Sequence, residues 1–166
     1  MAEAFSNSLS RAAGIVTSYS GSTVAAGSTA ITVTANTGIG VSDLIDNQHF
    51  IAGTKVHSIA GTTIYADRAS TNTASATAQV VKFLGPTTSY TSPSATKSIL
   101  IGGTFANNTN SSVNLTVETY DQSAGVGVAI ASKIPVPAGS SFVISDTGKT
   151  LLEAQDEIRV YCDTAN

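Results

Sequence analysis

Residues 134–162 read IPVPAGSSFVISDTGKTLLEAQDEIRVYC, and no other stretch says more about the fold class of this chain. Pro135 and Pro137 stand two residues apart, and because proline lacks an amide donor they cannot both serve a central strand. Further along, Ile158, Val160 and Cys162 fall at every second position, which is the period of a half-buried strand. The stretch therefore predicts an edge strand, turns and a closing strand of an antiparallel sheet.

The same stretch holds the densest acidic cluster of the chain, Glu153, Asp156 and Glu157. A carboxylate pair that acts as general acid and base needs its carboxyl groups about 5 to 9.5 Å apart across a cleft. Asp156 and Glu157 are adjacent, so an extended strand sends their side chains to opposite faces. Glu153 precedes an expected turn at Ala154 and Gln155. We therefore interpret the cluster as a solvated turn.

Residues 97–166 show the same short runs separated by turn residues. The apolar residues of three runs recur with a period of two and are expected on strands: Ile99, Ile101 and Phe105; Val113, Leu115 and Val117; Phe142 and Ile144. The loop 107–112, NNTNSS, is expected to join the first two runs as a hairpin. Further strands are expected at 126–132, at an edge, and at 150–152 and 157–163. This half is predicted to be an antiparallel β-sandwich, immunoglobulin-like or jelly-roll-like.

Residues 15–85 are predicted to form a separate small β module. Strands are expected at 29–35, 44–46, 54–59, 62–66 and 77–84, with Ile31 and Val33 on one face of the first and a turn at Ala60 and Gly61. Residues 86–96, which begin with Pro86, are predicted to be an extended linker.

Residues 1–14 are predicted to be a short N-terminal arm or helix. Phe5, Leu9 and Ala12 or Ala13 would share one face of a helix over residues 2–13. An extended arm fits the same residues equally well, so both alternatives stay open.

The composition agrees with an all-β fold and limits the partners. Val, Ile and Thr number 50 of the 166 residues, and these side chains suit a pleated sheet. Charged residues make up 11% and the net charge is -3, without a basic run, so neither nucleic acid nor an anionic membrane is an expected partner. No run approaches the roughly 20 apolar residues of a membrane helix, and the start lacks the features of a secretion signal. We expect synthesis in a cytoplasm.

The chemistry-bearing residues give little support for catalysis. His49 and His57, with Asp43, Asp46 and Asp67 nearby in sequence, would be a conceivable metal site, but a spacing of eight is no recognised ligand pattern. There is no G-x-S-x-G motif and no phosphate-binding glycine loop. The single cysteine, Cys162, excludes an intrachain disulfide and is expected in the core. The prediction is a non-enzymatic protein with no catalytic residue, cofactor or metal.

Four motifs, in this order, resemble small structural proteins of tailed-bacteriophage virions, particularly those of phages that infect cyanobacteria. They are MAEAFSNSLS at 1–10, FANNT at 105–109, IPVPAGSS at 134–141 and LLEAQD at 151–156. The stretch IAGTKVHSIAGTTIYADR, at 51–68, is similar to a small β module of phage structural proteins. In the last motif Gln155 stands where that family usually has glycine, so a turn of another type is an open alternative.

The resemblance implies a virion protein that works by repeated assembly. The expected role is a capsid decoration or cement protein on the head surface, a homo-oligomer, expected as a trimer, that contacts the major capsid protein. Two alternatives stay open: a neck- or tail-associated structural protein, and a receptor- or carbohydrate-binding fibre module. The expected location is the virion, after synthesis in the cytoplasm of a bacterial host.

Overall fold

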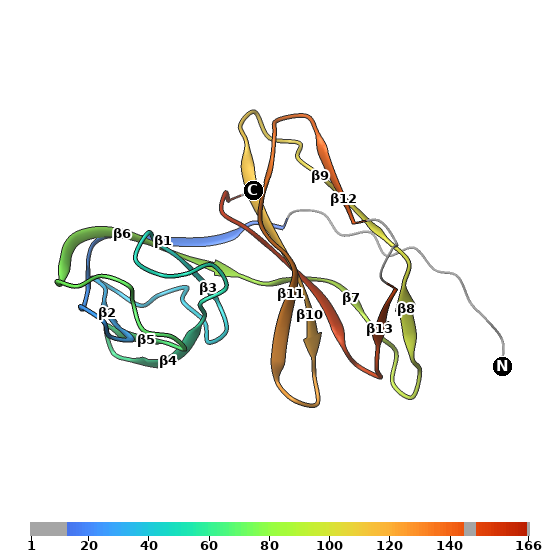
Figure 1. The fold of residues 1–166 in the computed structure, drawn as a ribbon, viewed down its shortest axis with the longest axis horizontal. Helices are drawn as coiled ribbons and strands as arrows, with labels where there is room; N and C mark the ends of the chain where they lie inside the picture. Colours follow the sequence, from blue (N-terminus) through green and yellow to red (C-terminus); the bar gives the residue numbers. More distant parts are fainter. Residues whose placement is uncertain (1–12, 145–148, 166) are drawn as a thin grey trace.

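The computed structural model describes residues 13–144 and 149–165, which form strands and connecting turns (Figure 1). The strands are β1 (Ile15–Val24), β2 (Ala30–Thr32), β3 (Leu44–Asp46), β4 (Val56–Ala60), β5 (Thr63–Ala66), β6 (Ala76–Gly85), β7 (Thr87–Thr91), β8 (Ser98–Leu100), β9 (Gly103–Ala106), β10 (Val113–Asp121), β11 (Val126–Val136), β12 (Ser141–Ile144), β13 (Thr150–Leu152) and β14 (Glu157–Cys162). The fold is all-β and antiparallel, as predicted. The arm or helix expected over residues 1–14 lies outside the described residues, apart from its last two positions.

The first module, residues 15–85, is a sheet that closes on itself. Its strand order is β3-β6-β1-β2-β5-β4. The chain at the two ends of this order meets through an antiparallel bridge between Leu44 of β3 and Lys55, just before β4. Beside it, the amide of Ser42 donates to the carbonyl of Val56 and the amide of Val56 to that of Asp43, both at 2.9 Å. This closure surrounds a core formed by Val24, Ile31, Val33, Ile39, Ile45, Phe50, Val56, Ile64, Ala66, Val81 and Phe83.

The alternation of the sequence predicts five of the six strands of this module. Ile31 and Val33 are both buried, which agrees with their expected place on one face of the strand. The hairpin turn between β4 and β5 is centred on Gly61 and Thr62, one residue later than expected. Gly61 has a positive φ of 59°, which the favoured two-residue hairpin turns require at their first central position. The pattern does not predict β1, because Ser and Thr interrupt its apolar alternation and because its register against β6 shifts on both sides of Ser22.

The prediction of a linker over residues 86–96 is wrong. Residues 87–91 are extended, but they form β7, which pairs with β14 and so belongs to the second module. Only Pro86 separates β6 from β7. The pattern does not reveal this pairing, because Thr and Ser fill most of β7 and its partner strand lies about 70 residues later in the sequence.

The second module, residues 87–165, is sandwich-like and has layers of unequal width. One layer is a four-stranded sheet, β11-β10-β14-β7. The other layer consists of two separate two-stranded ribbons: β9 pairs with β12, and β8 pairs with β13. Between the two layers lies a core that includes Val117, Leu152 and Val160, with Phe105 and Phe142 stacked at 6.4 Å. The strand that carries Pro135 is β11, at the edge of the sheet, as the prolines predict.

The predicted hairpin across the loop 107–112 is wrong. β9 pairs with β12, and β10 pairs with β11 and β14, so this loop carries the chain from one layer to the other. The side-chain amide of the buried Asn107 holds the crossing by donating to the carbonyls of Ser111 and Val136, both at 2.8 Å. Ile99 and Ile101 are also not on the side of Phe105: both are more than half exposed, whereas Phe105 packs against the core.

Candidate functional site

The three carboxylates of the acidic cluster do not converge. Asp156 is buried and accepts hydrogen bonds from the amides of Glu153, at 2.9 Å, and Gln122, at 3.2 Å. Glu157 pairs with Arg159 at 2.7 Å, and Glu153 pairs with Lys97 at 2.8 Å. Each carboxylate therefore has a structural partner of its own. The turn itself is confirmed, but the expectation that the whole cluster is solvated is wrong, because Asp156 is buried and Glu157 begins β14.

Gln155 occupies a position that suits glycine. Its φ is 68°, in the left-handed region, and the amide of Asp156 donates to the carbonyl of Glu153 across the turn at 3.3 Å. Positive φ at the third of four residues alone is typical of a type II turn. The turn is tied to the end of β7, because the amide of Ser92 donates to Asp156 O and the amide of Gln155 to Ser92 O. The glycine-type conformation is kept although the residue is not glycine.

The two histidines lie on different elements. The amide of His49 donates to the side chain of Asn47 in the loop after β3, whereas His57 lies on β4, beside Tyr65 and Asp67 in a shallow open groove. Residues 13–144 and 149–165 contain no group of three or more His, Cys, Asp or Glu that could hold a metal ion.

The carboxylates near the histidines have structural roles. Asp43 accepts the amide of Gly40 at 2.7 Å, and burial raises its pKa. Asp67 accepts the amide of Lys55 at 2.9 Å. Cys162 lies in the core of the second module, as predicted, and burial raises the pKa of its thiol.

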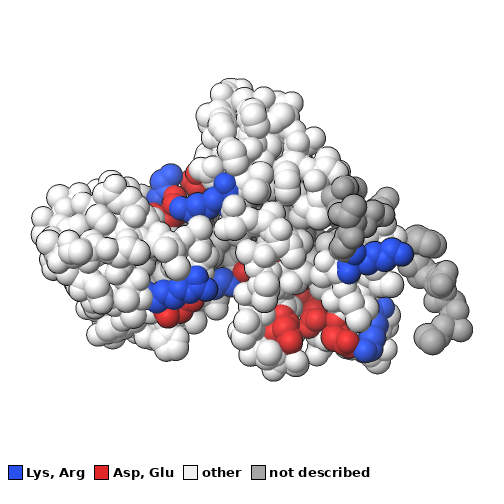
Figure 2. All heavy atoms as spheres, viewed as in Figure 1, with Lys and Arg blue, Asp and Glu red and all other residues white. Residues whose placement is uncertain are grey.

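What the structure does bring together is charge at the junction between the two modules. Figure 2 shows basic and acidic side chains gathered in the groove between the two lobes. Three lysine contacts cross this junction: Lys55 to Glu118 at 2.6 Å, Lys133 to Asp46 at 2.7 Å, and Lys82 to the backbone carbonyl of Asp163 at 3.2 Å. Three of the eight basic residues of the chain are therefore used to join the modules.

The most buried of these contacts centres on Glu118 of β10. Its side chain is 2% exposed, and besides Lys55 it accepts a hydrogen bond from the hydroxyl of Tyr161 at 2.6 Å. Tyr161 is itself fully buried, and burial together with this bond raises its pKa. Gly127 of β11 makes room for the carboxylate, because a Cβ at that position would lie 2.6 Å from the Glu118 Cδ. A buried charge is tolerated when it is paired and hydrogen-bonded, as here.

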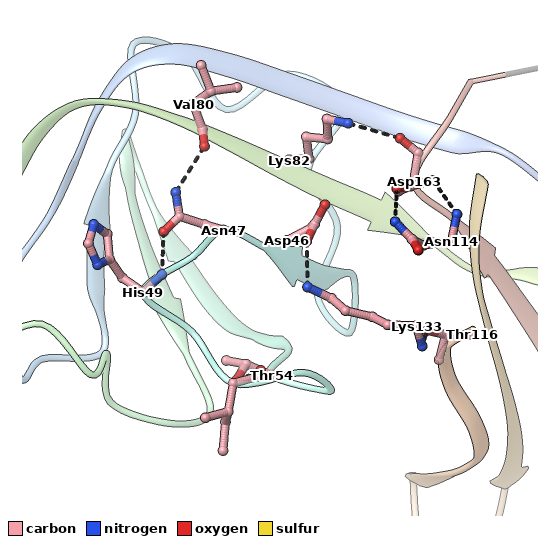
Figure 3. Close-up of polar contacts among 11 residues, drawn as sticks. Asp46, Asn47, His49, Thr54, Val80, Lys82, Asn114, Thr116, Lys133 and Asp163 are labelled. Carbon is pink, nitrogen blue, oxygen red and sulfur yellow. Dashed lines mark hydrogen bonds and ion pairs between the residues drawn. The ribbon is translucent and has the colours of Figure 1, made fainter. Parts of the chain in front are cut away.

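Figure 3 shows the second contact, in which Lys133 reaches Asp46. A small cavity of about 20 Å³ lies beside it. It is lined from both modules by Leu44, Ile45, Asp46, Gly53, Leu84, Asn114, Thr116, Lys133 and Asp163. That volume accommodates about one water molecule. An apolar contact of Leu44 and Leu84 with Tyr161 completes the junction. These contacts position the two modules relative to each other.

Sequence reasoning missed this junction. Lys55 and Glu118 are 63 residues apart, and Asp46 and Lys133 are 87 apart. No local spacing links such residues. The available signal was the scarcity of charge: in a chain with 11% charged residues, a lysine within an apolar strand needs a partner.

The described part of the chain contains no helix that could cross a membrane. Comparison with known proteins finds no matching family model, no matching curated protein and no matching solved structure.

Proposed function

We propose that this chain is a non-enzymatic structural protein of a tailed-phage virion, which decorates the head surface in many copies. The resemblance of MAEAFSNSLS, FANNT, IPVPAGSS and LLEAQD to virion proteins is the origin of the proposal. In this role the chain binds the major capsid protein and other copies of itself.

One observation carries the assembly role: strands of the second module direct large aliphatic side chains outward. Val126, Val128, Ile99, Val143 and Leu151 are each more than half exposed, at 54 to 62%. Single exposed apolar residues are ordinary, but Ile99 and Leu151 lie directly opposite each other on paired strands, and adjoining exposed apolar side chains are typical of a surface that another protein covers. The surrounding surface is rich in hydroxyls and poor in long charged side chains, so covering it desolvates little charge.

The junction supports the same role. A decoration protein that contacts the shell through one module must hold the other in a set direction. Here a single residue, Pro86, connects the strands of the two modules, and the lysine contacts of Lys55, Lys82 and Lys133 bridge them. Such a junction transmits the orientation of one module to the other.

The test is the stoichiometry of this chain relative to the major capsid protein in purified particles of the phage that encodes it, measured by quantitative mass spectrometry. Hundreds of copies are expected for head decoration. About 6 or 12 copies, as in a closed ring, would transfer the chain to the neck or tail. Absence from the particles would overturn the proposal.

A further inference from the structure

The outer face of the ribbon formed by β8 and β13 is apolar at its centre, with an ion pair at one end and the exposed Lys149 at the other. Ile99 and Leu151 lie directly opposite each other and are 57% and 55% exposed. The side chains two residues before Ile99 and two after Leu151 belong to Lys97 and Glu153, which form an exposed ion pair at 2.8 Å. Residues two apart on extended chain share a face, so these four side chains form one surface, hereafter the ribbon face.

The opposite face of the same ribbon is already used. Leu100 packs against the core of the second module, and Leu152 is 1% exposed. Among the described residues, β8 and β13 pair only with each other, so this ribbon is two strands wide where the facing sheet has four strands. The ribbon thus presents apolar side chains outward on one face while its other face seals the core.

The register makes the ribbon face complementary to itself. A two-fold axis along the ribbon, between β8 and β13, would place β8 of one copy over β13 of a second copy. Ile99 would then meet Leu151 of the second copy, and Lys97 would meet its Glu153. Both the apolar pair and the opposite charges match, and each match occurs twice, as in any isologous contact.

We propose that the ribbon face is a contact between two copies of this chain, packed face to face about this two-fold axis. The inference rests on the proposed function, since it names a surface through which copies assemble. Figure 1 places the ribbon at the end of the second module that faces away from the first module. The pair therefore leaves both first modules free at its outer ends. In a particle built from trimers, the contact would link copies of neighbouring trimers.

The size of the face sets the strength of the contact. Three aliphatic side chains, Ile99, Ile101 and Leu151, each about half exposed, contribute an area on the order of a few hundred Å². A standard stable interface buries about 800 Å² on each partner. A single pair is therefore weak in dilute solution and becomes populated when many copies are held close together, as on a particle surface.

The decisive experiment exchanges the charges one at a time. Lys97→Glu gives a copy with two acidic side chains at the end of the face, and Glu153→Lys gives a copy with two basic ones. Sedimentation velocity at chain concentrations up to about 1 mM, where weak encounters are populated, measures association. Each variant alone is expected to associate about tenfold more weakly than the unmodified chain, because like charges face each other. An equimolar mixture is expected to recover association, because each acidic copy then faces a basic one.

A second pair of variants tests the apolar centre. Leu151→Lys is expected to abolish measurable association, whereas Val80→Lys, at a 53% exposed valine of the first module, is expected to leave it unchanged. Thermal unfolding of all variants, followed by circular dichroism, verifies that each is folded.

Three results would overturn the contact: an unmodified chain that stays monomeric at the highest concentration, a mixture that associates no better than its components, or a Leu151→Lys variant that associates normally. None of them bears on whether the chain is present in purified particles, so the proposed function is judged separately. Loss of particle binding by Leu151→Lys without loss of self-association would assign the face to another virion protein and would also overturn the two-copy contact.

Discussion

The two modules differ in how they complete their hydrogen bonding and their cores. The first closes its sheet by joining its end strands, and seven of its core residues, among them Ile31, Ile64 and Phe83, are at most 2% exposed. The second covers a four-stranded sheet with two two-stranded ribbons, and in its core only Val117 and Leu152 are buried to that degree. Closure removes sheet edges, which are the usual sites of strand pairing. The difference indicates that the first module completes its own sheet, whereas the second module depends more on the contacts at the junction.

The largest loss of stability is expected from breaking the buried ion pair between Lys55 and Glu118 at the junction of the two modules. Lys55→Met would leave the buried carboxylate of Glu118 without its cation. Breaking a buried ion pair by removing one partner costs about 3 to 5 kcal/mol. Urea unfolding followed by circular dichroism should show this loss in the transition of the second module.

The matched control is Lys97→Met, which breaks the exposed pair with Glu153 and should cost less than about 1 kcal/mol. Replacing both buried partners, Lys55→Met with Glu118→Leu, should recover most of the stability, because no charge is then left unpaired. Equal losses for Lys55→Met and Lys97→Met would show that the junction does not stabilise the second module.

The next effect separates the two faces of the ribbon. Leu152→Ala removes a buried side chain from the core beneath the ribbon and should lower the free energy of unfolding by about 2 to 5 kcal/mol. Leu151→Ala, at the neighbouring and exposed position, should change it by less than about 0.5 kcal/mol. Similar losses at both positions would contradict the assignment of an inner and an outer face.

A smaller effect is expected at Gly127. Gly127→Ala places a Cβ against the Glu118 carboxylate, which Lys55 and Tyr161 hold in place, and overpacking of this kind costs about 1 to 3 kcal/mol. In a Glu118→Ala background the same substitution meets no carboxylate and should cost almost nothing. A double-mutant cycle on urea unfolding measures this coupling, and additive effects would refute the proposed clash.

The sequence predicts elements whose signal is local. The alternation in ITV and in EIRVYC locates β2 and β14, and the prolines at 135 and 137 locate β11 at an edge. It does not predict which strands pair with each other within each layer, because the polar loop 107–112 resembles a hairpin turn but carries the chain from one layer to the other. The sequence does not predict the junction either, because Lys55 and Glu118 are far apart in the chain and come together only in the folded structure. The turn at Gln155 lies between these cases: its position was predicted, and its type depended on one backbone angle.

The positive φ of Gln155 is the basis of the smallest predicted change in stability. Holding a residue other than glycine in the left-handed conformation costs about 1 to 2 kcal/mol of folding free energy. Replacing it by glycine removes this strain, but part of the gain is lost because glycine makes the unfolded chain more flexible. The side chain of Gln155 is exposed, so little else is lost on replacement. Gln155→Gly should therefore raise the free energy of unfolding of the second module by about 0.5 to 1 kcal/mol. Ala154→Gly, one residue earlier and not at positive φ, should lower it by a similar amount. Urea unfolding of the two variants side by side decides the matter: if both lower stability equally, the left-handed residue is not strained, and the second module gains nothing from the glycine usual in the family it resembles.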